Sequence, residues 1–385
     1  MPDSDEFCRL TMKVVIAQSD VVTAYGWGLD ALWKGLLSNQ TAIRPTDRFA
    51  ERGFLSNQAA LIPDLEILGD ESRAMAMARR LLSPLVKNID PMTPLILATT
   101  VGEIEYVEQS ILKENSELAA QARPQVLLER LKKLLGLRGH AMVISSACAS
   151  SAVALCRATS MIRHGDANRV LVVACDSVSE FVYSGFSTLL SLCDGPARPF
   201  DAQRSGLTLG EGAAWAMLTS DESPKAGAAS ILGWGNTTDA VHMTAPDRNA
   251  RGLSRAIAKA CKMSGKTVED ISFIAAHGTA TLYSDAMELL AFHGATTQPR
   301  PIFSIKGGIG HTLASAGLIQ ILIAARAMSL GILPPTVGLS VPDPSAVDWA
   351  SNKSVKIARA PLALSTSSGF GGVNTAVLLG GGNQS

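Results

Sequence analysis

The 385-residue chain has little charge and few aromatic side chains. Asp, Glu, Lys and Arg make up 18% of it, and 34 basic residues balance 34 acidic ones. A net charge of zero argues against a chain-wide attraction to nucleic acid or an anionic membrane, so any basic docking patch has to be local. Aromatic residues contribute 5%, whereas 47% of the residues are hydrophobic and 33 are glycine. This composition is typical of a compact enzyme with buried strands.

The sequence also shows no disulfide framework and no long apolar span. Its six cysteines have neither C-x-x-C spacing nor dense clustering, so we expect free thiols in a reducing, cytoplasmic setting. The start, "MPDSDEFCRL", is acidic and polar, which is not expected of a signal peptide. The longest apolar segment, "SAGLIQILIAARAM" (315–328), contains Gln320 and Arg326. A membrane span needs about 20 apolar residues, so we expect a core helix here.

Apolar runs bounded by glycine or polar residues alternate with longer helical patterns. The short runs predict strands over 13–17, 94–100, 141–147, 169–176, 214–219, 271–278, 301–307, 362–367 and 373–380. Helical periodicity predicts helices over 28–37, 72–88, 102–115, 148–164, 251–264, 284–293 and 311–330. Continuous apolar strands between helices predict an α/β fold whose sheets are covered on both faces.

A weak internal repeat suggests two similar halves. "SSACASSAVAL" and, about 160 residues later, "GGIGHTLASAGLIQIL" (307–322) each place small residues between a strand and an apolar helix. "SDESPKAGA" marks a turn near the expected join. We therefore predict an N-terminal half over 12–225 and a C-terminal half over 226–382. A single parallel, doubly wound domain is the alternative.

One cysteine lies where a predicted strand meets a predicted helix. The stretch is "VISSACASSAVALC" (143–156), and the residue is Cys148. A helix N-terminus offers unpaired N–H groups and partial positive charge, which favour the reactive thiolate and can hold an oxyanion. The small neighbours leave room for a thioester. A buried, inert thiol is the ordinary alternative, and we assign it to Cys156, Cys175 and Cys261.

A cysteine nucleophile usually needs histidine. Of six histidines, His277 in "AAHGTAT" and His311 in "SIKGGIGHTLASAG" follow predicted strands in glycine-containing turns. His164 and His293 fall on predicted helices, where surface or packing roles are expected. A metal site built from Cys148, His277 and His311 is disfavoured, because no pair has short ligand spacing.

Four segments together resemble the signatures of the β-ketoacyl-[acyl carrier protein] synthases of the thiolase superfamily: "SSACASS", "AAHGTAT", "SIKGGIGHTLASAG" and "SSGFGGVN". "ARPFDAQRSGLTLGEGAA" (197–214) resembles a further block of that family, and 13–43 resembles its first strand and helix. The resemblance extends over 12–380, loosely over 45–140. It implies a duplicated βαβαβαββ core in five layers, α-β-α-β-α, an elongating type of synthase, and a homodimer.

The resemblance also implies catalytic roles. Cys148 would accept the acyl chain from a donor thioester. His277 and His311 would bind the extender thioester and promote its decarboxylation. Lys306 and Glu288 match the supporting Lys and Glu that hold the histidines in place. An ordinary buried ion pair is the alternative for these last two residues.

Other residues would shape the substrate path. The N–H of Phe370 would complete an oxyanion hole with the N–H of the nucleophile, and its ring would be a gatekeeper beside the acyl pocket. The adjacent Gly369 and Gly371 would give that loop mobility. Thr279 and Thr281 match threonines that hydrogen-bond the pantetheine arm. A turn cap for the threonines and a core position for the phenylalanine are the structural alternatives.

These residue types suit a decarboxylative Claisen condensation. Decarboxylation of a malonyl thioester leaves an enolate, and donors aimed at its oxygen are worth about 3 kcal/mol of barrier each. The carbanion then attacks the acyl-cysteine. No resident cofactor is expected, because the phosphopantetheine arm arrives on the partner, an acyl carrier protein. Arg79 and Arg80 on the predicted 72–88 helix are expected to dock that partner; a solvated helix face is the alternative.

Departures from the family favour a specialised type II polyketide or polyene pathway over housekeeping fatty-acid elongation. Ala280 stands between the threonines where Gly or Ser is usual, "LYSD" (282–285) follows, and the segment before "RPFD" is short. A thiolase is disfavoured because no cysteine follows Cys261. A chain-length-factor-like or carrier-protein-binding subunit, with little condensing activity of its own, remains the alternative function. A heterodimer with such a subunit is the alternative assembly.

Overall fold

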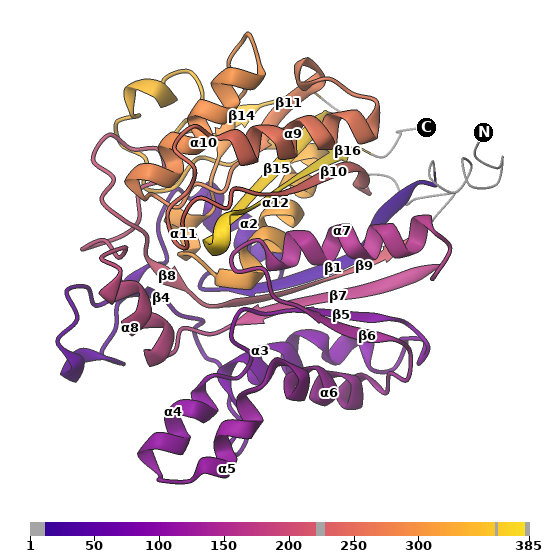
Figure 1. Cartoon of the computed structure of the whole chain (residues 1–385), viewed down its shortest axis with the longest axis vertical. Coiled ribbons are helices and arrows are strands. Elements are labelled where there is room, and N and C mark those ends of the chain that lie inside the picture. Colours follow the sequence, from indigo (N-terminus) through magenta and orange to yellow (C-terminus); the bar gives the residue numbers. More distant parts are fainter. Residues whose placement is uncertain (1–11, 221–227, 359–360, 382–385) are drawn as a thin grey trace.

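The computed structural model describes residues 12–220, 228–358 and 361–381. Cys8 and the expected boundary at 225/226 lie outside the described residues. Within the described chain, one mixed sheet runs through the molecule in the order β12-β11-β15-β16-β10-β1-β9-β7-β5-β6, with β2 paired to β1 (Figure 1). Its strands are β1 (Val14–Thr23), β2 (Gly26–Trp27), β5 (Leu95–Ala98), β6 (Ala141–Ile144), β7 (Arg169–Asp176), β9 (Gly212–Thr219), β10 (Ser230–Thr238), β11 (Ile271–Ala275), β12 (Ile302–Phe303), β15 (Leu362–Gly369) and β16 (Val373–Gly380).

The two ends of the sheet repeat one topology. From β6 through β5, β7 and β9 to β1, the pairings are parallel, parallel, antiparallel and antiparallel. The same series runs from β12 through β11, β15 and β16 to β10. A short antiparallel contact, Val14↔Ile231 and Val15↔Ser230, joins the two series. The predicted duplication is confirmed, and the all-parallel alternative is wrong because the central strands pair antiparallel.

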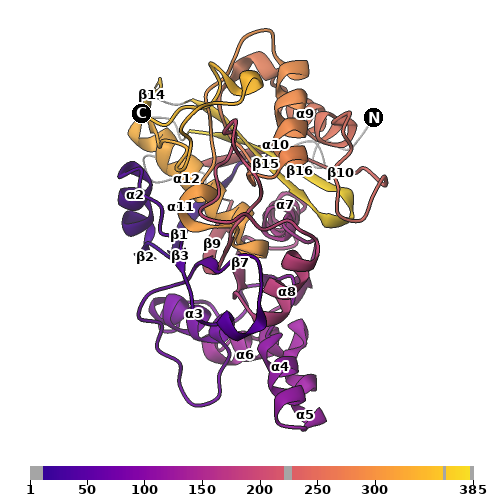
Figure 2. The same ribbon diagram turned by 90° about the vertical axis from the view of Figure 1, so that its left-hand side faces the viewer.

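Helices separate and cover the two half-sheets (Figures 1 and 2). α7 (Ser150–Arg163) and α12 (Ala316–Leu330) contact each other and pack between the inner sheet faces. α3 (Arg73–Leu82) and α6 (Pro124–Leu135) cover the outer face of the N-terminal half-sheet. α9 (Arg251–Ser264) and α10 (Leu282–Ala295) cover the outer face of the C-terminal half-sheet. The three hydrophobic clusters between these layers give the expected α-β-α-β-α order.

α12 is the apolar segment expected to form a core helix. The stretch Leu313–Leu330 is long and apolar enough to cross a membrane by composition, but 78% of it is buried inside the structure. Its one amide, Gln320, donates from Nε2 to the Ala275 carbonyl at 2.6 Å and the Thr366 carbonyl at 2.9 Å. The helix is therefore part of the core, and it is tied by hydrogen bonds to the C-terminal half-sheet.

Some boundaries differ from the prediction. The strand before Cys148 ends at Ile144, and the strand predicted over 301–307 divides into β12 and a helical turn, α11 (Lys306–Ile309). Only glycine fits in this turn at position 307, because a Cβ would lie 1.7 Å from the Val337 carbonyl oxygen. The remaining elements are α2 (Leu29–Leu37), β3 (Arg44–Pro45), β4 (Gln58–Ala60), α4 (Glu105–Leu112), α5 (Ser116–Ala119), α8 (Glu180–Thr188), β8 (Leu209–Gly210), β13 (Ile332–Leu333) and β14 (Val355–Lys356).

Candidate active site

Cys148 lies in a tight turn between β6 and α7. Ala147, just before it, has a φ of 48°, in the left-handed region that residues with a Cβ adopt only at a cost. Ser150 stabilises the turn: its Oγ accepts from the Ser146 N–H at 2.8 Å and donates to the Ala147 carbonyl at 2.5 Å. The turn thus fixes the sulfur at the N-terminal end of α7, with the side chain only 6% exposed.

The loop after β15 comes very close to this turn. At Gly369 a Cβ would lie 3.1 Å from the Cys148 backbone nitrogen and 3.2 Å from the Ser146 carbonyl oxygen, so only glycine fits without displacement. The backbone N–H groups of Cys148 and Phe370 both face the sulfur and stabilise its negative form. Two donors at this point are the arrangement that an oxyanion formed next to the sulfur would require.

His277 follows β11 and is held from two sides. The buried Glu288 carboxylate on α10 accepts from the backbone N–H groups of His277 at 2.8 Å and Gly278 at 2.6 Å. The Lys306 Nζ lies 3.3 Å from His277 Nδ1 and also donates to its carbonyl oxygen. Among the ion pairs of the described residues, Lys306 and Glu288 do not form one. Since Lys306 can only donate, Nδ1 accepts and the ring proton lies on Nε2.

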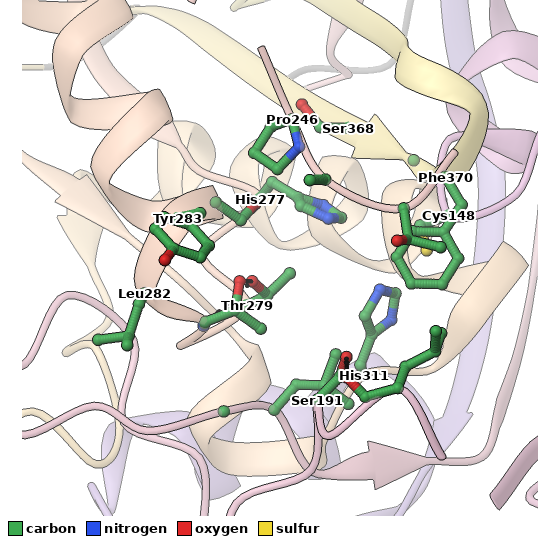
Figure 3. Close-up of a pocket in the computed structure, with 18 of the residues that line it drawn as sticks. Cys148, Ser191, Pro246, His277, Thr279, Leu282, Tyr283, His311, Ser368 and Phe370 are labelled. Carbon is green, nitrogen blue, oxygen red and sulfur yellow. Dashed lines mark hydrogen bonds between the residues drawn. The ribbon is translucent and has the colours of Figure 1, made fainter. Parts of the chain in front are cut away.

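His311 has the same tautomer for a different reason. The Leu313 backbone N–H donates to its Nδ1 at 3.1 Å, which leaves the proton on Nε2. The two imidazole centroids are 5.5 Å apart, with the rings at 84°. Burial and the nearby Lys306 charge hold the pKa of both rings well below the ordinary value. Two neutral imidazoles therefore offer N–H donors to the same cavity (Figure 3).

The thiol of Cys148 is protonated at rest. Burial raises its pKa to about 11, the Asp176 carboxylate adds to that effect, and the Lys306 charge opposes it. The backbone N–H groups and the Lys306 charge favour the thiolate, as expected from the sequence, but burial of the sulfur shifts the thiol pKa the other way and outweighs them. The sulfur has to lose its proton during acyl transfer.

Cys148 stands between two cavities. The smaller, about 300 Å³, is lined by both imidazoles, Thr279 and Thr281. The larger, about 720 Å³, extends from the other side of the sulfur. Its apolar lining includes Val101, Ile111, Leu112, Phe181, Val182 and Leu313.

An aromatic pair lies where the two cavities meet. Phe186 on α8 and Phe370 line both cavities, and their rings stack with centroids 5.5 Å apart. Figure 3 shows the Phe370 ring beside the Cys148 sulfur. The phenylalanine is therefore half-buried in the site and not a plain core residue.

The threonines form one wall of the smaller cavity. The hydroxyl oxygens of Thr279 and Thr281 lie 3.0 Å apart. Ala280 between them has a φ of 69° and donates its N–H to the buried Asp285 carboxylate at 3.0 Å. Thr281 precedes α10 but makes no side-chain cap hydrogen bond. Thr279 does stabilise the turn, since its hydroxyl oxygen accepts from the Thr281 backbone N–H at 3.3 Å, so binding of the pantetheine arm by the threonines stays a prediction.

Two residues of the site were not predicted from the sequence. Phe186 lies on α8, a helix that the periodicity did not indicate. Asp176 ends β7 and is fully buried next to the nucleophile. The sequence did contain a signal for Asp176: it is a polar residue at the carboxyl end of an apolar strand. In the described part of the chain no three His, Cys, Asp or Glu side chains are placed to hold a metal ion.

Other expected residues lie away from both cavities. Arg79 pairs with Glu71 at 2.8 Å, and the Arg80 guanidinium sits 4.0 Å from the centre of the Trp27 ring. Neither arginine lines a cavity of the site. Docking of a carrier protein here stays a prediction, and the pairing with Glu71 reduces the positive charge that Arg79 can offer.

The comparisons with known proteins agree with this geometry. Residues 97–223 match the family profile "Beta-ketoacyl synthase, N-terminal domain", and residues 228–340 match "Beta-ketoacyl synthase, C-terminal domain". The 3-oxoacyl-[acyl-carrier-protein] synthase 2 of Synechocystis sp. is 30% identical, with 94% of this chain and 96% of that protein covered. A protein of Streptomyces cyaneus described as a polyketide β-ketoacyl synthase is 29% identical, with 97% and 99% covered.

A solved structure shows the same fold. "The ishigamide ketosynthase/chain length factor" superimposes with a TM-score of 0.88 at 27% identity, covering 97% of this chain and 100% of that chain. Members of the matched family act on acyl groups carried by acyl carrier protein. The chain therefore belongs to the β-ketoacyl synthase family, and it is a thiolase-like condensing enzyme of the 3-oxoacyl-[acyl-carrier-protein] synthase type, an acyltransferase.

Proposed function

We propose that the protein joins an acyl group held on Cys148 to the two-carbon unit of malonyl-acyl carrier protein. The observation that carries this proposal is the meeting of one thiol and two neutral imidazoles in a single cavity, with a second cavity behind the sulfur. The smaller cavity would take the phosphopantetheine arm, which hydrogen-bonds to Thr279 and Thr281. The larger cavity would take the acyl chain.

In the first step Cys148 attacks the donor thioester. The sulfur forms a bond to the acyl carbon, the carrier's C–S bond breaks, and the thiol proton ends on the released arm. The tetrahedral intermediate carries its negative charge on the former carbonyl oxygen. The N–H groups of Cys148 and Phe370 are placed to stabilise that charge, which lowers the barrier.

In the second step the malonyl thioester loses its carboxylate. The C–C bond breaks, carbon dioxide leaves, and the electron pair passes to the thioester oxygen as an enolate. Nε2–H of His277 and Nε2–H of His311 donate to that oxygen. The Lys306 charge keeps both rings neutral, so neither ring passes a full proton to the enolate.

In the last step the enolate carbon attacks the acyl-enzyme carbonyl. The new C–C bond forms, the C–S bond to Cys148 breaks, and the sulfur takes up a proton. The β-ketoacyl product stays on the carrier arm. Each turnover consumes one acyl donor, one malonyl carrier and one proton from solvent, and the enzyme is regenerated.

For the pathway, we favour polyketide or polyene elongation. Ala280 between the two threonines and the short segment before "RPFD" support this choice, and the larger cavity adds some polar groups to a mainly apolar lining. Its polar lining includes Arg52, Thr100, Glu108, Ser145, Glu180 and Ser184. Acyl donors of equal length, one saturated and one carrying conjugated double bonds or keto groups, test the choice. A higher kcat/KM for the saturated donor would instead favour fatty-acid elongation.

We also propose that the protein works as a dimer with a second subunit of the same fold. β6 is the last strand of the sheet, and an unpaired edge can extend into a partner. Ile111 and Leu112 on α4 are each 72% exposed, and Phe181 on α8 is 57% exposed, although all three line the larger cavity. A homodimer is the first expectation and a chain-length-factor-like partner the second. The cytoplasmic location stays a prediction.

Mass spectrometry of the intact protein tests the proposed activity directly. Incubation with an acyl donor should add one acyl group at Cys148, and malonyl-acyl carrier protein should then remove it and yield β-ketoacyl carrier and carbon dioxide. A protein that binds the carrier but is never acylated would contradict the proposal. That result would favour the alternative of a partner subunit with little condensing activity.

A further inference from the structure

A buried carboxylate next to the site has no part in the steps above. Asp176 ends β7 and is 0% exposed. Its Oδ1 accepts from the Thr99 hydroxyl at 2.6 Å, and its Oδ2 accepts from the Thr100 hydroxyl at 2.7 Å. The Thr100 backbone N–H lies 3.1 Å from both oxygens. No cation is among the partners found for it in the described structure.

The fourth partner of Asp176 lies in the other half of the chain. The Ala314 backbone N–H donates to Oδ2 at 2.9 Å. Ala314 belongs to the 3₁₀ turn Leu313–Ser315, which is separated from His311 only by Thr312. One carboxylate thereby connects the ends of β5 and β7 with the turn behind a decarboxylation residue.

That turn decides which nitrogen of His311 carries the proton. The Leu313 N–H donates to Nδ1 at 3.1 Å, and Leu313 has a φ of 53°, a conformation that costs free energy for a side chain of its kind. The next amide along the chain is the one bound by Asp176. A strained turn keeps its conformation only when its surroundings hold it, and the carboxylate holds the neighbouring amide.

We propose that Asp176 is a positioning residue for decarboxylation: it fixes the turn after His311 so that Leu313 N–H stays on Nδ1 and Nε2–H points into the smaller cavity. The proposal rests on the proposed function, in which His311 stabilises the enolate. Acylation of Cys148 uses the backbone donors beside the sulfur and not the Nε2–H of His311, and loss of the Asp176 charge would lower the thiol pKa, which favours acylation. The two half-reactions should therefore respond differently when Asp176 is changed.

Asp176→Asn is the first test because it keeps the shape and removes the charge. The amide has only one oxygen, so its NH₂ must face a donor such as the Ala314 N–H. We expect release of carbon dioxide from malonyl-acyl carrier protein to fall about 10- to 100-fold, no more than the smallest loss seen when a single oxyanion donor is removed outright. The rate of acylation of the protein by an acyl donor should not fall by more than about threefold.

Asp201→Asn is a matched control. Asp201 is 1% exposed and accepts from the backbone N–H groups of Gln203, Ser340 and Val341 at 2.7–2.9 Å, but it lines neither cavity. Asp201→Asn should lower stability but change the rates of acylation and decarboxylation by the same factor. Equal loss of both half-reactions in Asp176→Asn, or the same pattern in both variants, would overturn the proposal and leave Asp176 a purely structural residue.

The tautomer of His311 gives a readout that a loss of stability alone would not move. In ¹⁵N-histidine spectra the wild-type ring should carry its proton on Nε2, and Asp176→Asn should show a mixture of tautomers. An unchanged Nε2–H signal would contradict the proposal. If the variant does not fold, Ala314→Pro removes the same hydrogen bond from the donor side, and it must then show the selective loss of decarboxylation.

The two half-reactions in the wild type show whether the condensation or only the positioning role of Asp176 has failed. If wild-type protein neither becomes acylated nor releases carbon dioxide, the condensation itself is wrong. If both half-reactions occur in the wild type and only the selectivity of Asp176→Asn is missing, condensation stands and the positioning role is rejected.

Discussion

At the scale of single residues, the site combines groups whose pKa values are shifted in complementary directions. Burial raises the pKa of the Cys148 thiol to about 11 and lowers that of the Lys306 ammonium to about 8. The imidazoles are held neutral by burial and by that ammonium. A protonated thiol and neutral rings are the forms that acyl transfer and enolate stabilisation start from. The sequence motifs located these residues, but they contain no information on desolvation, so the protonated thiol could not be predicted.

Alkylation of Cys148 should therefore be slow at neutral pH. The thiolate is the reacting form, and with a pKa of about 11 its fraction rises about tenfold per pH unit until that value is approached. The rate of modification by iodoacetamide, followed by intact mass between pH 6 and about 10, should show no plateau. Lys306→Met should lower the rate mainly below about pH 8, where the ammonium that favours the thiolate is still protonated. A plateau below neutral pH would contradict the protonated resting state.

Removal of the sulfur and removal of an imidazole should disable different half-reactions. Cys148→Ala should not be acylated yet should still release carbon dioxide from malonyl carrier, because both N–H donors remain. His311→Ala should still be acylated, while carbon dioxide release falls at least about 100-fold with loss of one donor to the enolate. Quantified acyl-enzyme and trapped carbon dioxide measure the two steps. Loss of both steps in both variants would argue against separate roles.

At the scale of elements, the ends of the strands position the catalytic residues, and the loops after them determine which side chains fit there. β7, β16 and α9 were predicted with their observed bounds, because each is a clean apolar or amphipathic pattern. β10 was missed because Gly233 and Gly235 interrupt it. Both glycines are required by packing against α9: a Cβ at Gly235 would lie 2.1 Å from the Ala256 carbonyl oxygen. A local sequence pattern cannot show that glycine is needed for packing against a helix that begins only at Arg251.

The loop after β15 offers a matched pair of glycine substitutions. Gly369→Ala has no backbone penalty, but its methyl group would push against the Cys148 nitrogen, so we expect acylation to slow at least about tenfold through a displaced oxyanion donor. Gly371→Ala meets no atom within 4 Å but sits at a φ of 81°, so it should cost about 1–2 kcal/mol of stability.

The two glycine variants are separated by measuring acylation rate and thermal unfolding for each. Gly369→Ala should mainly change the rate, and Gly371→Ala should mainly change the unfolding temperature. The reverse pattern would show that the close approach at Gly369 does not govern the donor.

At the scale of the whole molecule, the site spans both repeats of the fold. The nucleophile comes from the series that ends in β6, and the two imidazoles come from the series that ends in β12. The sequence predicted this division through its weak internal repeat. It did not predict α6, although Pro124 at its first turn and Gly136 after its end are common helix boundaries. The family resemblance implied an acyl pocket beside Phe370, but not the lining of the larger cavity, which combines residues from 52–189 with Leu313 and Phe370.

Assembly should depend on the exposed apolar face of α4. The double variant Ile111→Glu and Leu112→Glu should not destabilise a monomer, because both side chains are already 72% exposed. If a second subunit covers them, the charges should convert a dimer to monomers in light scattering. Met263→Glu on α9, 48% exposed in the monomer, is the control. A monomeric wild type, or a dimer unaffected by the double variant, would reject this face as the interface.

The stacked Phe186 and Phe370 rings have a consequence for repeated elongation. In the proposed reaction the lengthened chain leaves the sulfur on its carrier, and another round requires its return to Cys148 with its tail past the two rings, in the larger cavity. A chain long enough to reach the far wall of that cavity could not be transferred again. The depth of the larger cavity would then limit the number of rounds.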